Sequence, residues 1–205
     1  MIKLFVFDLG NVILPFEHRQ IAIRLLKKTR RKIVPSPQEF FSFMFDMENG
    51  LVNPYEEGLI SSMEFFVIIR DRYELQISFD EFKNIWNPIF QSNPDMDEAI
   101  QYLKFKRLPL FLLSNTNELH FSYIIKTYPI VHAFDEWILS FEVGAKKPKK
   151  RIFDVIFEKM DISSGSVFYV DDIAENVDAA RACWCQGMVF KEASELWEVI
   201  RKNEI

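Results

Sequence analysis

The sequence predicts an α/β fold, in which helices cover both faces of a doubly wound parallel sheet and a helical domain is inserted after the first strand. Three short runs, at residues 4–7, 108–113 and 167–170, are apolar on both faces. Each run ends in polar residues and is followed by a helix-like segment, the pattern of β-α-β units in a parallel sheet. About a hundred residues between the first two runs contain no convincing strand, far more than one crossover helix needs.

The inserted segment reads as a series of helices. Apolar periodicity predicts them at residues 18–31, 37–48, 62–73 and 79–86, and a fifth at 95–106 leads back to the sheet. Ser61 with Glu64, and Ser78 with Glu81, have the spacing of capping boxes and mark two helix starts. We therefore expect an α/β core domain of residues 1–15 and 95–205 and a helical domain of residues 16–94.

The remainder of the chain continues the alternation of helices and strands. Helices are expected at 118–127, 149–160, 176–185 and 193–202, and short strands at 137–139 and 188–190. The phenylalanines of residues 40–45 are expected to pack in a core.

Composition excludes several classes of protein. The 205 residues are 49% apolar and 27% charged, as in ordinary globular chains. A net charge of −5 gives no attraction to nucleic acid or anionic membranes, and no uncharged apolar run reaches 18 residues. Cys183 and Cys185 have neither disulfide-framework nor zinc-ligand spacing, which fits a reducing cytoplasm. We expect a cytoplasmic enzyme without nucleic-acid or membrane partners, and no feature sets its oligomeric state.

Polar residues end the three predicted core strands. Asp8 follows the first, Ser114 and Asn115 the second, and Asp171 and Asp172 the third. The carboxyl ends of parallel strands lie at one edge of a sheet, where open α/β folds bind ligands. Three carboxylates in one crevice repel one another, and either a raised pKa or a divalent cation among them relieves the repulsion. We favour the cation, since oxygen ligands suit Mg²⁺. The sequence thus predicts a magnesium site that binds a phosphorylated substrate.

A carboxylate beside Mg²⁺ can attack phosphorus and form an aspartyl phosphate, and Asp8 is the candidate nucleophile. Charge on the phosphoryl oxygens then needs donors and a cation. Ser114 and the backbone amides after Asp8 are candidate donors, and Lys147 in the turn of residues 144–148 is the candidate cation.

Four segments in this order resemble the motifs of the haloacid dehalogenase superfamily. They are FVFDLGNV (5–12), LLSNTN (112–117), GAKKP (144–148) and FYVDDIAEN (168–176). The resemblance implies a Rossmann-like core and a helical cap inserted after the first motif. It also implies that Asp8 is the nucleophile, that Ser114 binds phosphate and that Lys147 bridges the two. Mg²⁺ would then be held by Asp8, the Gly10 carbonyl and Asp172, with Asp171 near or in its ligand shell.

One position departs from most phosphatases of that superfamily. They carry a second aspartate two residues after the nucleophile, as proton donor and acceptor, and here that position is Gly10. General acid-base catalysis contributes about 10²- to 10⁴-fold. Glu17 and His18 are the candidate substitutes. The segments around Asp8 and Ser114 resemble most those of the bacterial α-D-glucose-1-phosphate phosphatases. An anomeric oxygen is a better leaving group than a primary alcohol, so hydrolysis of a sugar 1-phosphate would be slowed least by the lack of an acid at Gly10.

The expected function is Mg²⁺-dependent hydrolysis of a small phosphorylated metabolite, and a sugar phosphate is the preferred candidate substrate. Asp8 and Lys147 are the expected catalytic residues, and Ser114 and Asn115 are expected to bind the substrate. Two alternatives stay open at this point. One is a hydrolytic dehalogenase, which needs no metal and is disfavoured by the uncompensated Asp171-Asp172 pair. The other is a regulatory module that binds phosphate and has lost turnover through Gly10.

Overall fold

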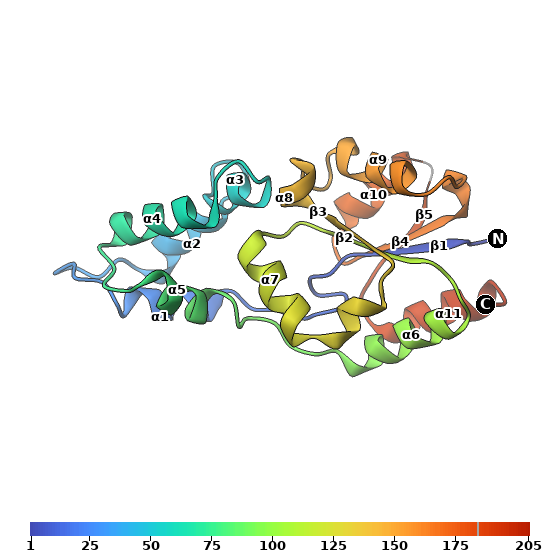
Figure 1. Cartoon of the computed structure of the whole chain (residues 1–205), viewed down its shortest axis with the longest axis horizontal. Coiled ribbons are helices and arrows are strands. Elements are labelled where there is room, and N and C mark those ends of the chain that lie inside the picture. The colour runs from blue at the N-terminus through green and yellow to red at the C-terminus, as the bar shows by residue number, and fades with distance from the viewer. Residues whose placement is uncertain (184) are drawn as a thin grey trace.

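The computed structural model describes residues 1–183 and 185–205, and a five-stranded parallel sheet forms its centre (Figure 1). The strand order is β3-β2-β1-β4-β5, and all four pairings are parallel. The strands are β1 (Leu4–Phe7), β2 (Leu110–Ser114), β3 (Glu136–Leu139), β4 (Val167–Asp171) and β5 (Gln186–Val189). Helices cover both faces, so the predicted α/β class is confirmed.

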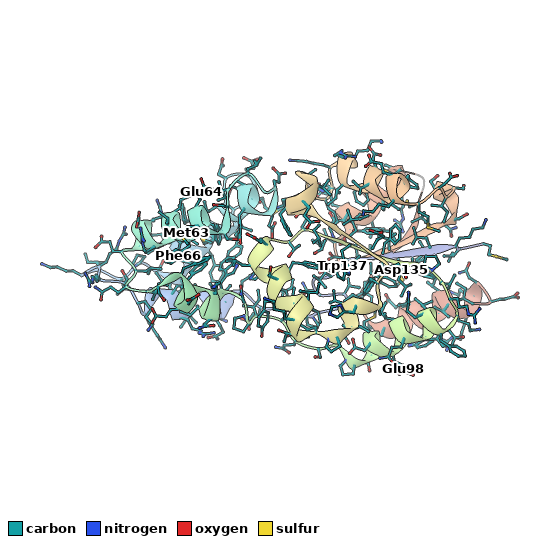
Figure 2. The ribbon with its side chains drawn as sticks, in the orientation of Figure 1. Met63, Glu64, Phe66, Glu98, Asp135 and Trp137 are labelled. Atoms are coloured by element: carbon teal, nitrogen blue, oxygen red, sulfur yellow. The ribbon has the colours of Figure 1, made fainter. Side chains whose placement is uncertain are left out.

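Alternate side chains of β1 enter different cores, because successive residues of a strand point to opposite faces. Phe5 and Phe7 pack with one set of helices, and Leu4 and Val6 pack with the other. The first set is α6 (Pro94–Phe105), α7 (Glu118–Thr127) and α11 (Ala193–Lys202), and the second is α9 (Lys150–Lys159) and α10 (Ala174–Ala182). On the first face Trp137 of β3 meets Phe121 of α7, ring centroids 5.4 Å apart (Figure 2). Burial on both faces explains why the strands are apolar throughout.

Five helices between β1 and α6 form a separate helical lobe beyond the sheet (Figure 1). They are α1 (Arg19–Leu26), α2 (Pro37–Phe45), α3 (Val52–Glu56), α4 (Ser62–Tyr73) and α5 (Phe79–Trp86). The lobe has its own hydrophobic cluster, in which Phe40 is fully buried and the other phenylalanines of α2 are partly buried. Met63 and Glu64 lie on the outer side of α4 (Figure 2). Residues 16–94 as one domain, and 1–15 with 95–205 as the other, remain a prediction.

Two chain segments connect the lobe to the sheet, and they pair with each other. The amide of Glu17 donates to the carbonyl of Ile89 at 3.2 Å, and the amide of Gln91 donates to the carbonyl of Pro15 at 2.8 Å. Paired connections of this kind hold the lobe close to the carboxyl edge of β1.

Both predicted capping boxes are present. The side chains of Ser61 and Ser78 accept hydrogen bonds from the amides of Glu64 and Glu81, and each glutamate accepts one in return from the serine's amide. They start α4 and α5 at the residues that the sequence predicted.

Two lobe helices are shorter than predicted, and in each case a side chain just beyond the helix end hydrogen-bonds to the backbone. The helix expected to reach residue 31 ends at Leu26, and Thr29 Oγ1 then donates to the carbonyl of Tyr73 at 2.5 Å. The helix expected to reach residue 48 ends at Phe45. There Asp46 Oδ1 accepts from the amides of two following residues and forms a turn.

The remaining differences are at element ends. Strand β2 begins at Leu110 rather than 108, since Pro109 has no amide hydrogen for the ladder. Helix α10 ends at Ala182, so its predicted extension to 185 is wrong at residues 183 and 185. The chain has to leave the helix there to enter β5. Residue 184 lies outside the described residues. Helix α3 and the short helix α8 (Ser140–Val143) were not predicted.

Cys183 is a half-buried free cysteine and Cys185 a buried one. Within residues 1–183 and 185–205, the helices are all too short or too polar to cross a lipid bilayer.

Candidate active site

The strand order reverses direction at β1, which lies between β2 and β4. Such a switch point opens a crevice at the carboxyl ends of the strands. Asp8 directly follows β1, Ser114 ends β2, and Asp171 ends β4 with Asp172 next to it. The structure therefore brings to one place the strand-end residues that the sequence singled out.

Lys147 lies at the centre of this group. Its Nζ is 2.6 Å from Asp8 Oδ1 and 2.8 Å from Asp171 Oδ2, and it also donates to the carbonyl of Leu113 at 3.1 Å. All three charged side chains are buried, and that of Asp171 is 0% exposed. Three acceptors around one ammonium group fix its position between the ends of β1, β2 and β4.

The charges in this cluster do not balance. Asp8, Asp171 and Asp172 have carboxylate oxygens that all lie within 4.8 Å of one another, and Lys147 contacts two of the three, Asp8 and Asp171. Burial raises the pKa of Asp8 to about 7; Lys147 opposes this shift, and Asp171 and Asp172 add to it. Burial also raises the pKa of Asp172. For Lys147, burial lowers the pKa, but the two contacting carboxylates outweigh that effect and raise it.

Asp171 and Asp172 differ in what they contact. Asp171 accepts hydrogen bonds from the Tyr169 hydroxyl, the Ile173 amide and the Asn176 side chain as well as from Lys147. Its oxygens are thus taken up by protein donors. Asp172 is half-buried and accepts one side-chain hydrogen bond, from Asn11 Nδ2 at 3.3 Å. The structure leaves Asp172 the freer of the two for a ligand.

The side-chain amide of Asn115 makes two hydrogen bonds with the backbone of Lys147. Asn115 Oδ1 accepts from the Lys147 amide at 2.7 Å, and Nδ2 donates to the Lys147 carbonyl at 3.1 Å. The next residue is tied to α8, since Ser140 Oγ accepts from the Thr116 amide and donates to its carbonyl, both at 3.0 Å. Ser140 was not singled out in the sequence, because a lone serine carries no motif.

A narrow cavity of about 50 Å³ lies beside this cluster, between the sheet and the helical lobe. Among its lining residues Gly10, Ser114 and Asn115 come from the predicted motifs, and Phe16, His18, Glu56, Phe90 and His120 close it from the lobe, its connections and α7. Glu56 had no signal in the sequence that related it to this edge.

The two predicted substitutes for the missing aspartate lie in different places. His18 lines the cavity, and burial lowers its pKa to about 4, so its imidazole is neutral at neutral pH. Glu17 is exposed and is not among the residues that line the cavity. His120 is buried, with Nδ1 3.1 Å from Asn117 Nδ2 and Nε2 3.1 Å from the carbonyl of Trp86.

The cavity wall from the helical lobe is joined to the turn that carries Lys147. Lys146 Nζ is 2.7 Å from Glu56 Oε2 and donates to Asn53 Oδ1 at 2.8 Å. The neighbouring Glu57 pairs with Lys149. Two ion pairs, with lysines on either side of Lys147, therefore join the end of α3 to the segment that follows α8. Helix α3 lies next to α8 (Figure 1).

A model of the haloacid dehalogenase-like hydrolase family matches residues 2–183. The chain belongs to this family. The resemblance that the four motifs predicted is confirmed, and so is the prediction that the chain is a hydrolase.

Two characterised relatives are phosphatases. The D-ribitol-5-phosphate phosphatase of Bacteroides thetaiotaomicron is 26% identical over 184 residues, which cover 86% of each chain. The phosphorylated carbohydrates phosphatase of Thermotoga maritima is 22% identical over 143 residues, 63% of this chain and 66% of that one.

Solved structures of the family show the same fold. A family enzyme from Bacteroides thetaiotaomicron, in complex with magnesium and inorganic phosphate, superposes with a TM-score of 0.80 at 24% identity, covering 93% of this chain and 95% of that one. A family hydrolase from Bacillus subtilis bound to magnesium gives a TM-score of 0.69 at 16% identity, covering 98% and 99%.

Proposed function

We propose that this chain is a Mg²⁺-dependent phosphatase that hydrolyses a small phosphorylated carbohydrate through an aspartyl phosphate on Asp8. The observation that carries the proposal is the buried Lys147, held between Asp8 and Asp171 at the switch point of the sheet. A buried lysine between two carboxylates costs desolvation energy that a purely structural contact rarely justifies. The relatives named above act on phosphorylated carbohydrates, which supports the substrate class.

The residues present fit Mg²⁺. Three carboxylates against one lysine leave excess negative charge. Burial is the main cause of the raised pKa of Asp8, and the neighbouring Asp171 and Asp172 add to it. Oxygen ligands suit Mg²⁺, and Asp8, Asp172 and the carbonyl of Gly10 would hold it. Asp171, whose oxygens are already engaged, would position Lys147 instead. When bound, Mg²⁺ would neutralise charge on the phosphoryl group and the nucleophile.

The chain's own residues divide the remaining work. Asp8 would attack phosphorus through a carboxylate oxygen, and the leaving oxygen would depart with the bond's electron pair. Lys147 and the hydroxyl of Ser114 would stabilise charge on the phosphoryl oxygens. Asn115 would keep the backbone of Lys147 in place through its paired hydrogen bonds.

Hydrolysis of a panel of sugar, polyol and aryl phosphates, with Mg²⁺ and with EDTA, tests the proposal. We expect phosphate release that requires Mg²⁺, and an acid-stable phosphorylated protein that is lost in Asp8→Asn. Release of halide from 2-haloacids without metal would instead identify a dehalogenase. Phosphate binding without turnover of any compound would identify a regulatory module.

A further inference from the structure

A side chain at Gly10, in the turn after the nucleophile, would require the ring of Phe16 to shift. A β-carbon added to Gly10 would lie 2.5 Å from Cε1 of Phe16, whose ring fills the space beside the turn. If Asp8 forms an aspartyl phosphate, as proposed above, another group has to accept the proton of the water that hydrolyses it. This inference rests on the proposed function.

Three titratable side chains line the cavity beyond the carboxyl cluster: His18, Glu56 and His120. Both ring nitrogens of His120 are engaged, one with Asn117 and the other with the Trp86 carbonyl. The ring of His18 packs against aromatic rings, with centroids 4.8 Å from Phe16 and 4.5 Å from Phe45. Glu56 is thus the carboxylate that the helical lobe places in the cavity.

The surroundings of Glu56 suit a base. Its Oε2 pairs with Lys146 Nζ at 2.7 Å, and the same ammonium group is held by Asn53 Oδ1 at 2.8 Å. Among the described residues, no hydrogen bond engages Glu56 Oε1. One oxygen is therefore anchored and the other is free to contact water.

We infer that Glu56 is the general base for hydrolysis of the aspartyl phosphate. The oxygen of a water molecule attacks phosphorus while one of its protons passes to Glu56 Oε1. The bond between phosphorus and Asp8 breaks, and its electron pair returns to the Asp8 carboxylate. Inorganic phosphate and protonated Glu56 result, and Glu56 then releases the proton to solvent.

Glu56 is the last residue of α3, and α3 lies beside α8, which directly follows β3 (Figure 1). The proposed base therefore lines the cavity from the side of the helical lobe.

Rapid-mixing kinetics with p-nitrophenyl phosphate and Mg²⁺ test the inference. The nitrophenolate leaving group needs no proton, so the first step stays fast in Glu56→Gln. We expect a burst of about one nitrophenolate per active site, followed by a steady state at least ~100-fold slower than wild type. Phosphoprotein should accumulate during that phase. Glu56→Asp, which restores a carboxylate, should recover part of the rate.

Glu57→Gln is the matched control. Glu57 is the next residue, its side chain is also 18% exposed, and it also pairs with a lysine of the facing turn, yet it does not line the cavity. We expect near wild-type turnover and no burst. Lys146→Gln removes the ion pair with Glu56 and keeps the Glu56 carboxylate. We therefore expect a smaller loss of turnover than in Glu56→Gln and no accumulation of phosphoprotein.

Equal behaviour of Glu56→Gln and Glu57→Gln would overturn the inference, as would a Glu56→Gln variant that changes KM alone. A burst in Lys146→Gln as large as in Glu56→Gln would show that the ion pair matters and the base does not. The proposed function fails separately, if Asp8→Asn turns over or if wild type never forms phosphoprotein. Circular dichroism of each variant verifies that it is folded.

Discussion

The ring of Phe16 covers Gly10, with Cε1 2.5 Å from the position that a β-carbon would take. The ring is held in turn by Phe90 and His18, at centroid distances of 5.9 and 4.8 Å. The backbone of Gly10 does not need a positive φ; the left-handed residue of this turn is Asn11, at 55°. The obstacle to a side chain at position 10 is therefore the packing of the Phe16 ring and not the backbone conformation.

Gly10→Asp should lower the stability by about 1–3 kcal/mol, because the new side chain overpacks against Phe16. The double variant Gly10→Asp with Phe16→Ala should recover part of that loss, since the ring is what the new atoms meet. Thermal melting of the single and double variants measures the effect. A Gly10→Asp protein that melts like wild type would show that Phe16 moves aside at little cost.

Asp8→Asn should reduce turnover by at least ~10³-fold while the protein stays folded. The amide has nearly the same shape but is no nucleophile. Steady-state phosphate release and thermal melting are measured together. Substantial activity in the folded variant would rule out an aspartyl phosphate on Asp8.

Asp172→Ala should weaken Mg²⁺ binding by more than about tenfold, because it removes a carboxylate whose side-chain hydrogen bond comes from the exposed Asn11 and which is otherwise available to the metal. Asp95→Ala, in the first turn of α6, is the control and should bind Mg²⁺ as wild type does. Titration calorimetry gives both affinities. Equal affinities for the two variants would place the metal elsewhere.

The stability of the protein should fall as the pH drops below about 6.5. Burial lowers the pKa of His120 to about 3, and His18 adds to the shift. In the unfolded chain this histidine has its ordinary pKa of 6.5. Between pH 6.5 and about 3 it is therefore protonated in the unfolded chain and neutral in the folded one. Each unit by which the pH falls in this range lowers the free energy of unfolding by up to ~1.4 kcal/mol. Urea unfolding measured from pH 4.5 to 7.5 follows the effect.

His120→Gln should remove this proton's share of the pH dependence and keep a donor for the Trp86 carbonyl. His132→Gln, at an exposed histidine, is the matched control for the exchange of a histidine for glutamine. If His120→Gln leaves the slope unchanged, His120 is not the group that titrates.

Much of the fold could be predicted from local patterns. Runs that are apolar on both faces identified β1, β2 and β4, and the spacing of Ser61 with Glu64 and of Ser78 with Glu81 gave the starts of α4 and α5. The same strand ends predicted which side chains meet, because parallel strands bring their carboxyl ends to one edge. Helix ends were predicted less well where a side chain from a distant segment offered the backbone another partner, as at Thr29.

By itself, the sequence determined the family, the α/β class and the group of Asp8, Ser114, Lys147, Asp171 and Asp172, since these depend on short patterns and their order. Only the tertiary structure decided that Asp171 holds Lys147, that the ring of Phe16 fills the space beside Gly10, and that Glu56 enters the cavity. Glu56 and Lys146 are 90 residues apart in sequence, and Gly10 and Glu56 are 46 apart. Such contacts arise from how the helical lobe packs over the sheet edge, and no local periodicity encodes that placement.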